Sequence, residues 1–214
     1  MKREYIFIIP ARSKSKRLKG KNLKIFKGKP LLFWTIEQAL KFRKFGSIIL
    51  TTDSDHTLNK CSIFSGLLLD KRPDYLATDE ASLIKVAMYI ANKYNFKKNI
   101  IILQPTSPLR KDIDIKKGLR ILKKGARAVM SQTKLQYNSS KLGRLNKNSN
   151  FSILDSLKSE IYAPNGSFFG AKYEWLKKNN SFYTKTVKTF NMPAERSIDI
   201  DYKYQFIMAE ALMN

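Results

Sequence analysis

The 214-residue chain contains a single cysteine, Cys61, and a single histidine, His56. One cysteine cannot form an intramolecular disulfide, so a reducing, cytoplasmic setting is expected, with Cys61 as core filler rather than a nucleophile. The count also excludes zinc sites built from cysteine and histidine. A histidine-dependent nucleophilic triad is not expected either, because His56 falls early in a predicted surface helix.

Long apolar runs and acidic residues are scarce too. No run approaches the length of a membrane span, and the apolar residues near the start are too few for a signal peptide. The chain contains 41 Lys and Arg but only 17 Asp and Glu, which gives a formal net charge of +24. This excess fits an acidic partner such as nucleic acid, an anionic membrane surface or a small polyanion. The alternative is compositional bias, because many lysines fall in solvated stretches such as "NKYNFKKNI".

The hydrophobic pattern alternates between continuous apolar runs and helix-like spacing. Strands are predicted at residues 4–10, 47–53, 99–105 and 126–132, and helices at 30–42, 54–65, 81–94 and 112–124. Uniformly apolar strands that alternate with helices predict an α/β fold, a Rossmann-like, mostly parallel sheet with helices on both faces. Residues 165–178 resume this theme, and residues 195–213 predict a short strand and a terminal helix. The length favours one domain over residues 1–214.

Residues 134–164 interrupt the pattern. The segment is polar, rich in Asn, Ser and Lys, with isolated Leu and Ile. A compact domain rarely needs so long an irregular stretch. We interpret it as an arm that packs on a partner subunit, with a disordered loop as the alternative.

Several polar segments follow predicted strands, at the edge where parallel sheets bind ligands. The loop from Ala11 to Asn22 carries six cations and two serines, which could hold phosphates together with backbone N–H groups. It matches neither the Walker pattern nor G-x-G-x-x-G, and a solvated basic loop is the alternative. Gln104 ends an apolar strand and would face the same edge, where a buried amide needs a partner.

The segment "SIDID" places Asp199 and Asp201 two residues apart. In an extended chain both side chains point to one side. Paired carboxylates near a phosphate suit a hard cation such as Mg²⁺. The alternatives are a solvated strand end, or Asp201 as the cap of the last helix.

Six segments, in order, carry a resemblance to a known family: "IIPARSKSKRLKGKNL", "TTD", "RPDYLATDEAS", "LQPTSPLR", "NGSFFGA" and "MPAERSIDID". Together they resemble the CMP-sialic acid synthetases (acylneuraminate cytidylyltransferases), including relatives that act on legionaminic and pseudaminic acids. The resemblance implies a fold of the nucleotide-diphospho-sugar transferase type. It also implies that CTP and a nine-carbon 2-keto sugar acid give a CMP-sugar and pyrophosphate, with Mg²⁺ as cofactor.

The resemblance also implies site residues. CTP would be held by Arg12, Ser15, Lys16, Lys21, Asn22, Arg72 and Ser82. The sugar acid would meet Gln104, Asn165 and Gly166, and Mg²⁺ would bind Asp199 and Asp201. Among these, Arg12, Lys21 and Asp201 would assist the reaction itself. The arm at 134–164 would reach across a homodimer, and neither a specific nucleic acid nor a membrane span is expected.

The chain departs from the family pattern at several positions. Ser13 and Lys14 stand where many members have glycine or small polar residues, and Ala163 stands where an arginine usually precedes "NG". Tyr202, Tyr204 and Gln205 follow "SIDID" in place of a threonine and a further acid, and the arm is short. These departures favour an unusual sugar. An eight-carbon acid such as Kdo is an alternative substrate, and a basic nucleic-acid-binding protein is an alternative of another class.

Overall fold

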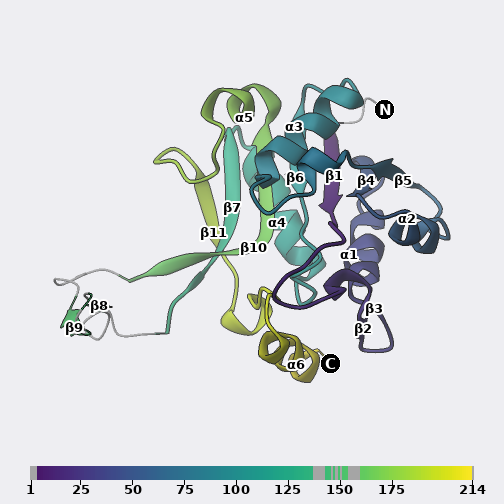
Figure 1. The fold of residues 1–214 in the computed structure, drawn as a ribbon. Helices are drawn as coiled ribbons and strands as arrows, with labels where there is room; N and C mark the ends of the chain where they lie inside the picture. The colour runs from purple at the N-terminus through teal and green to yellow at the C-terminus, as the bar shows by residue number, and fades with distance from the viewer. Residues whose placement is uncertain are drawn as a thin grey trace.

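The computed structural model describes residues 4–136, 143–145, 147, 149, 151–153 and 160–213. These residues form a central seven-stranded sheet with the strand order β11-β7-β10-β6-β1-β4-β5 (Figure 1). The strands are β1 (Tyr5–Pro10), β4 (Gly46–Thr52), β5 (Leu67–Lys71), β6 (Asn99–Ile102), β7 (Ala128–Lys134), β10 (Tyr162–Lys172) and β11 (Lys188–Asn191). Within this described sheet β10 runs antiparallel to β6 and β7, and the other neighbours are parallel. The predicted mostly parallel α/β fold is confirmed.

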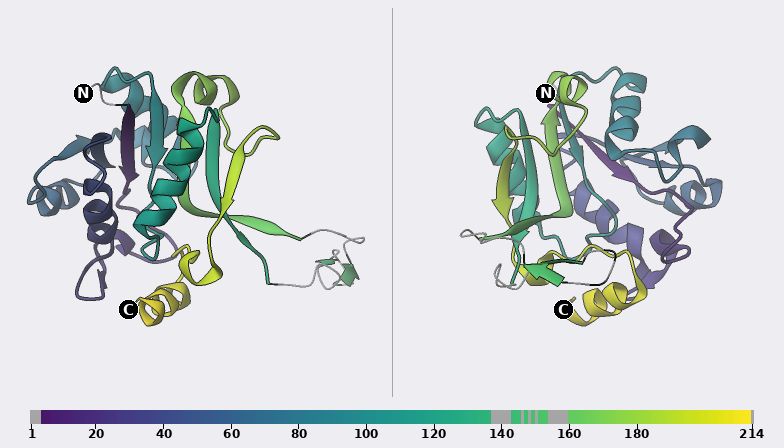
Figure 2. Two further views of the ribbon diagram at one scale, coloured as in Figure 1. Left: turned by 180° about the vertical axis from the view of Figure 1, so that it is seen from behind. Right: turned by 60° about the vertical axis from the view of Figure 1, so that its left-hand side comes forward.

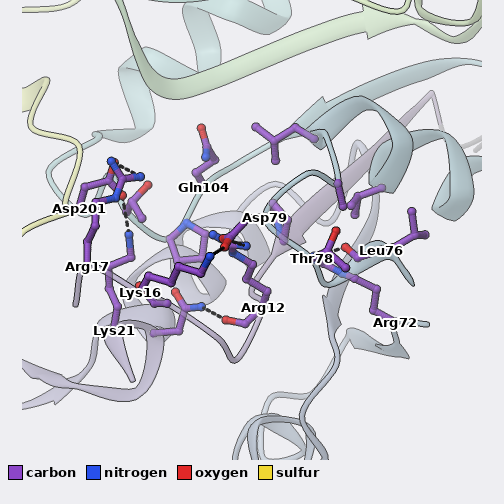
Figure 3. A pocket seen from close by; sticks show the side chains of 18 of the residues that line it. Arg12, Lys16, Arg17, Lys21, Arg72, Leu76, Thr78, Asp79, Gln104 and Asp201 are labelled. Carbon is purple, nitrogen blue, oxygen red and sulfur yellow. Dashed lines mark hydrogen bonds and ion pairs between the residues drawn. The ribbon is translucent and has the colours of Figure 1, made fainter. Parts of the chain in front are cut away.

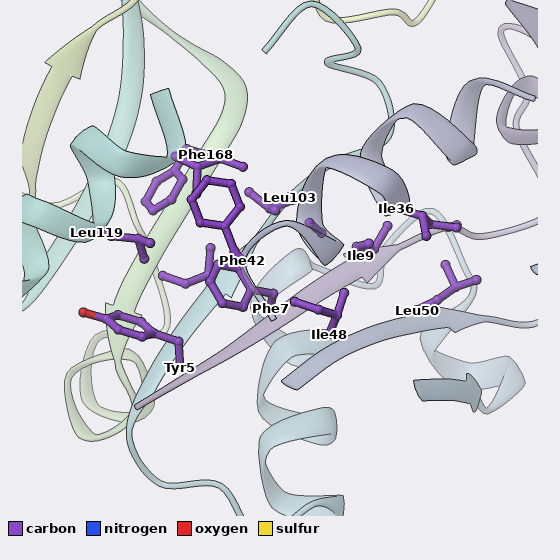
Figure 4. Close-up of a cluster of buried hydrophobic side chains, with 14 of the residues drawn as sticks. Tyr5, Phe7, Ile9, Ile36, Phe42, Ile48, Leu50, Leu103, Leu119 and Phe168 are labelled. Atoms are coloured by element: carbon purple, nitrogen blue, oxygen red, sulfur yellow. The ribbon is translucent and has the colours of Figure 1, made fainter. Parts of the chain in front are cut away.

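Helices cover both faces of the sheet. Successive side chains of each buried strand point to opposite faces, so both faces are apolar and need a cover. Phe7 and Ile9 of β1 pack with α1 (Leu31–Leu40), α2 (Asp55–Cys61) and α4 (Asp112–Lys123), the cluster shown in Figure 4. Ile6 and Ile8 pack instead with α3 (Leu83–Lys93) and α5 (Tyr173–Asn179). Such two-sided burial explains why the strand is apolar throughout.

Cys61 belongs to the first of these clusters and has no exposed surface. Burial raises the pKa of its thiol to about 11. A thiol that stays protonated at neutral pH is a poor nucleophile, so the expected role as core filler is confirmed.

A third apolar cluster lies beyond the carboxyl edge of the sheet. The terminal helix α6 (Lys203–Leu212) packs Phe206 edge-on against Phe26 of the small hairpin formed by β2 (Ile25–Phe26) and β3 (Lys29–Pro30). The short 3₁₀ turn η1 (Lys21–Leu23) precedes this hairpin. The basic loop is therefore fixed between β1 and a packed hairpin, rather than left as a free surface loop.

Two parts of the sequence prediction need correction. Strands β5 and β11 were not predicted, because the apolar run of β5 is only three leucines long and β11 contains a single apolar residue, Phe190. The short strand predicted at the start of 195–213 is wrong: residues 194–196 form the 3₁₀ turn η4 and residues 197–201 lie outside any strand. The backbone N–H of Ile200 donates to the Thr106 carbonyl, so a loop rather than a strand holds this segment.

The outer ends of β7 and β10 leave the body of the molecule together. Tyr162 pairs with Lys134 and Ala163 with Thr133 there, and Figures 1 and 2 show both strands projecting towards the hairpin of β8 (Gly143–Leu145) and β9 (Phe151–Ile153). Residues 137–142, 146, 148, 150 and 154–159 of the predicted arm lie outside the described residues. No helix in the described part of the chain is long and apolar enough to cross a membrane.

Candidate active site

A cavity of about 530 Å³ lies at the carboxyl edge of the parallel strands. Its walls come from four separate stretches: the loop after β1, the segment after β5, the residues that follow β6, and the aspartates before α6. Figure 3 shows Asp201 beside Arg17 and Lys21 at one end, Arg72 and Leu76 at the other, and Asp79 between Arg12 and Lys16. A parallel sheet brings such distant segments together because its strands all end at one edge.

The basic loop is held in shape from within. The side-chain amide of Asn22 donates to the Arg12 carbonyl at 2.9 Å, and the backbone N–H of Ser13 donates to Asp53 at 2.7 Å. Gly20 has a φ of 63°, the left-handed region that glycine adopts at little cost, and this turn directs the chain into η1. The loop therefore presents its cations from a defined backbone.

Lys21 is the most buried cation of this loop, with a side chain 10% exposed. Its ammonium group donates to the Ile200 carbonyl at 2.5 Å and to Asp201 Oδ1 at 2.9 Å. Arg17 reaches the other oxygen of the same carboxylate at 2.9 Å and lies over the Tyr202 ring. Asp201 thus receives one cation on each carboxylate oxygen.

Asp199 has a different environment from Asp201. Its Oδ1 atom is buried and has no hydrogen-bond partner among the described residues. Burial, with the nearby charge of Asp201, raises the pKa of Asp199. A buried carboxylate oxygen without a donor is costly, and a bound cation would remove that cost.

A second ion-pair cluster lies nearer the middle of the cavity. Asp79 accepts Arg12 at 2.5 Å on Oδ1 and Lys16 at 2.6 Å on Oδ2. The hydrogen bonds from Lys16 and Arg12 hold the pKa of Asp79 below its usual range. Arg12 and Lys16, two of the four cations that the family resemblance assigns to CTP, are therefore both paired with a carboxylate of the protein itself.

The far end of the cavity is less polar. Arg72 is almost fully buried and donates to the Thr51 carbonyl at 2.8 Å, and burial lowers the pKa of its guanidinium to about 10. The apolar side chains beside it are Leu76, Ala81, Leu83 and Val86. Such a surface is suited to a flat ring with a few polar groups.

The segment that carries Asp199 and Asp201 is anchored on both sides. Arg196 makes two hydrogen bonds to the buried carboxylate of Asp114 at the start of α4, at 2.8 and 3.2 Å. On the other side Asn165 donates to the Ser197 hydroxyl at 2.9 Å and accepts from Ser131 at 2.5 Å. These contacts fix the aspartates relative to both β10 and α4.

A smaller cavity of about 310 Å³ adjoins the first, and Asp199 lines both. Asn165, Ala163, Tyr204 and Met208 are among its other walls. Gly166 lies close by with a φ of 71°, and a Cβ atom there would sit 3.1 Å from both Asp199 Oδ2 and Gln104 Oε1. Glycine is therefore favoured by the backbone conformation, and a side chain there would crowd Asp199 and Gln104.

The structure brings most of the predicted site residues together. The large cavity is lined by Arg12, Ser15, Lys16, Lys21, Asn22, Arg72, Gln104, Asp199 and Asp201. Ser82 is not among the lining residues, because its hydroxyl caps α3 by accepting from the Lys85 N–H, although its neighbours Ala81 and Leu83 do line the cavity. Asn165 lines the smaller cavity, with its amide hydrogen bonds used inside the protein.

Two charged lining residues were missed from sequence. Arg17 and Asp79 both belong to quoted motifs, "SKRL" and "LATDEAS", but received no role. Their importance depends on partners far along the chain, Asp201 for Arg17 and Arg12 for Asp79. No local signal indicates such pairings.

The model of the cytidylyltransferase family matches residues 6–212. The CMP-N,N'-diacetyllegionaminic acid synthase of Legionella pneumophila is 32% identical, over 96% of this chain and 94% of its own length. The N-acylneuraminate cytidylyltransferase of Escherichia coli is also 32% identical over 98% of this chain, which spans only 52% of that relative. The predicted family resemblance is confirmed.

Solved structures agree on the fold. A CMP:2-keto-3-deoxy-manno-octonic acid synthetase complexed with CTP superposes with a TM-score of 0.73, at 16% identity and over 98% of both chains. A 4-diphosphocytidyl-2C-methyl-D-erythritol synthase gives a TM-score of 0.74 at 9% identity, over the full length of both chains.

Proposed function

The chain belongs to the cytidylyltransferase family, and we propose that it transfers CMP from CTP to the anomeric hydroxyl of a nine-carbon 2-keto sugar acid, with release of pyrophosphate. The observation that carries this proposal is the large cavity, which combines clustered loop cations, an apolar end and two aspartates. Its polar end suits a triphosphate and its apolar end a pyrimidine ring. The adjoining cavity next to Asp199 offers a place for the sugar acid.

In this scheme the protein positions groups rather than reacting covalently. The sugar hydroxyl forms a bond to the α-phosphorus and releases its proton to solvent, while the bond to the leaving pyrophosphate breaks and charge develops on the phosphate oxygens. Arg12, Lys16, Arg17 and Lys21 line the cavity and can hold those oxygens by charge-assisted hydrogen bonds. The apolar wall near Leu76 orients the base, and Gln104 and Gly166 orient the sugar acid beside Asp199.

We also propose that Asp199 and Asp201 hold Mg²⁺. The unpartnered, buried Oδ1 of Asp199 supports this, because an oxygen that lacks a donor can accept a hard cation. The described residues contain no group of three His, Cys, Asp or Glu that could hold a metal, so phosphate oxygens and water would complete the coordination. Bound there, Mg²⁺ would supply positive charge to the phosphates during transfer.

The direct test is pyrophosphate release from CTP and Mg²⁺ with a panel of nonulosonic acids and with Kdo. We expect release with at least one nine-carbon acid and less with Kdo. The panel also tests the consequence of Ala163. This residue lines the smaller cavity and offers no charge to the carboxylate of the sugar acid. Absence of release with every acid would contradict the proposal.

CTP binding is testable without a sugar. A ligand at 100 times its Kd stabilises the folded state by about 2.7 kcal/mol, which for a chain of this size raises Tm by roughly 5–10 °C. We expect CTP to produce such a shift and UTP and ATP to produce smaller ones, measured by thermal denaturation. Equal shifts with all three would mean that the cavity binds triphosphates without selecting the base.

A homodimer is our remaining proposal for this enzyme. The paired ends of β7 and β10 project from the body, and α6 exposes Tyr204, Ile207 and Met208 at 60%, 55% and 50%. Met208 and Tyr204 also line the smaller cavity, so a second copy on this face would lie beside the sugar acid. Light scattering should give twice the mass of the chain, whereas a fully active monomer would rule the dimer out.

A further inference from the structure

Asp79 forms ion pairs with Arg12 and Lys16, two of the cations that the proposed function assigns to phosphate. Its two carboxylate oxygens lie 2.5 Å from Arg12 and 2.6 Å from Lys16. A phosphate group offers the same arrangement, several anionic oxygens that accept from two separate cations. The carboxylate comes from the segment between η2 (Asp74–Leu76) and α3, on the opposite wall of the cavity from the basic loop.

The neighbouring acid does not share this position. Glu80 is exposed, and its pKa is lowered by a backbone hydrogen bond and by Thr78. Thr78 and Asp79 line the cavity, whereas Glu80 does not. Two adjacent exposed carboxylates thus carry the same charge, but only Asp79 is paired with Arg12 and Lys16 among the described residues.

We propose that Asp79 is an internal competitor of phosphate, which holds Arg12 and Lys16 in the ligand-free protein and must be displaced when a polyphosphate binds. This inference rests on the proposed function, because it takes the loop to be the phosphate site. A ligand then meets a site that is only partly available, and its apparent Kd exceeds the intrinsic value by the inverse of the available fraction. The same competition helps to expel pyrophosphate after the reaction, since Asp79 returns to the cations that the product leaves.

The competition applies only to ligands that use these two cations. Cytidine has no phosphate, so its affinity should not depend on Asp79. Pyrophosphate uses the cations and needs no sugar acid, so it reports on the competition independently of catalysis. A matched pair of variants is available, because Asp79→Asn and Glu80→Gln each remove one negative charge from adjacent positions.

The experiment is calorimetric titration of inorganic pyrophosphate into the wild-type protein and both variants, at physiological salt and one Mg²⁺ concentration. Exposed ion pairs are modest in strength, so for two of them we expect Asp79→Asn to lower the Kd roughly three- to tenfold. Glu80→Gln should change it less than about twofold, because among the described residues no ion pair joins Glu80 to Arg12 or Lys16, and an unpaired exposed charge contributes little. Cytidine should bind all three proteins alike, and Asp79→Ser should repeat the effect of Asp79→Asn.

Equal changes of the pyrophosphate Kd in Asp79→Asn and Glu80→Gln would overturn the inference, because they would reflect the general electrostatic field of the protein. Weaker pyrophosphate binding by Asp79→Asn would overturn it as well, by showing that Asp79 supports the loop instead of competing. Failure of the proposed function looks different: the wild-type protein would then release no pyrophosphate from CTP. Turnover of CTP with an unchanged pyrophosphate Kd in Asp79→Asn would remove only the competitor role.

Discussion

Replacing Lys21 with alanine is expected to lower kcat/KM by about 30- to 1,000-fold, the effect of losing about 2–4 kcal/mol of transition-state stabilisation. Lys21 is nearly buried and already oriented by the Ile200 carbonyl and Asp201. A cation held in place before the substrate arrives loses little further side-chain freedom on binding, and low exposure reduces solvent screening of its charge. Steady-state kinetics with CTP varied would measure the loss.

Lys14 provides the control on the same loop. It is exposed and is not among the residues that line the cavity. Lys14→Ala should change kcat/KM by no more than about twofold, as expected for a solvated charge. Circular dichroism would confirm that both variants fold. Similar small losses in the two variants would mean that the loop acts as a general positive field, and would contradict the phosphate assignment for Lys21.

Much of the fold is predictable because the buried strands carry an unambiguous pattern. Residues 100–103 and 5–9 are apolar on both faces, as strands of a sheet covered on two sides must be. The helix predicted from residue 54 starts as expected, because the Ser54 hydroxyl caps α2 by accepting from the Thr57 N–H. Strands β5 and β11 were not predicted, because an edge strand needs fewer apolar residues than a central one and so shows a weaker pattern.

The site was predictable to the extent that it depends on topology. Parallel strands end at one edge, so Arg12 and Gln104 could be expected to converge although they lie far apart in the chain. Asp201 follows no strand, and its place in the same site was expected from the family resemblance. The pairing of individual charges was not predictable. With 41 cations and 17 acids, the sequence does not indicate that Asp79 meets Arg12 or that Arg17 meets Asp201. Such choices depend on distances of a few ångströms that the fold alone decides.

Replacing Asp201 with asparagine is expected to lower turnover by two or more orders of magnitude while leaving the fold intact. The substitution keeps the shape of the side chain and removes its charge, and an amide is a poor ligand for Mg²⁺. It also leaves Lys21 and Arg17 without the carboxylate that orients both. The backbone N–H of Asp201 still donates to Gln205, which preserves the start of α6.

Titration with Mg²⁺ separates the two consequences of this change. If Asp201 binds the metal, the Mg²⁺ concentration for half-maximal activity of Asp201→Asn should rise at least tenfold, and excess Mg²⁺ should restore part of the turnover. If Asp201 only orients Lys21 and Arg17, the activity falls but its Mg²⁺ dependence stays that of the wild type. Asp55→Asn is the matched control, because it removes an exposed carboxylate paired with Lys71 at 2.6 Å. Near-normal turnover of Asp201→Asn would contradict both roles, since the metal ligand and the counter-charge would then be dispensable.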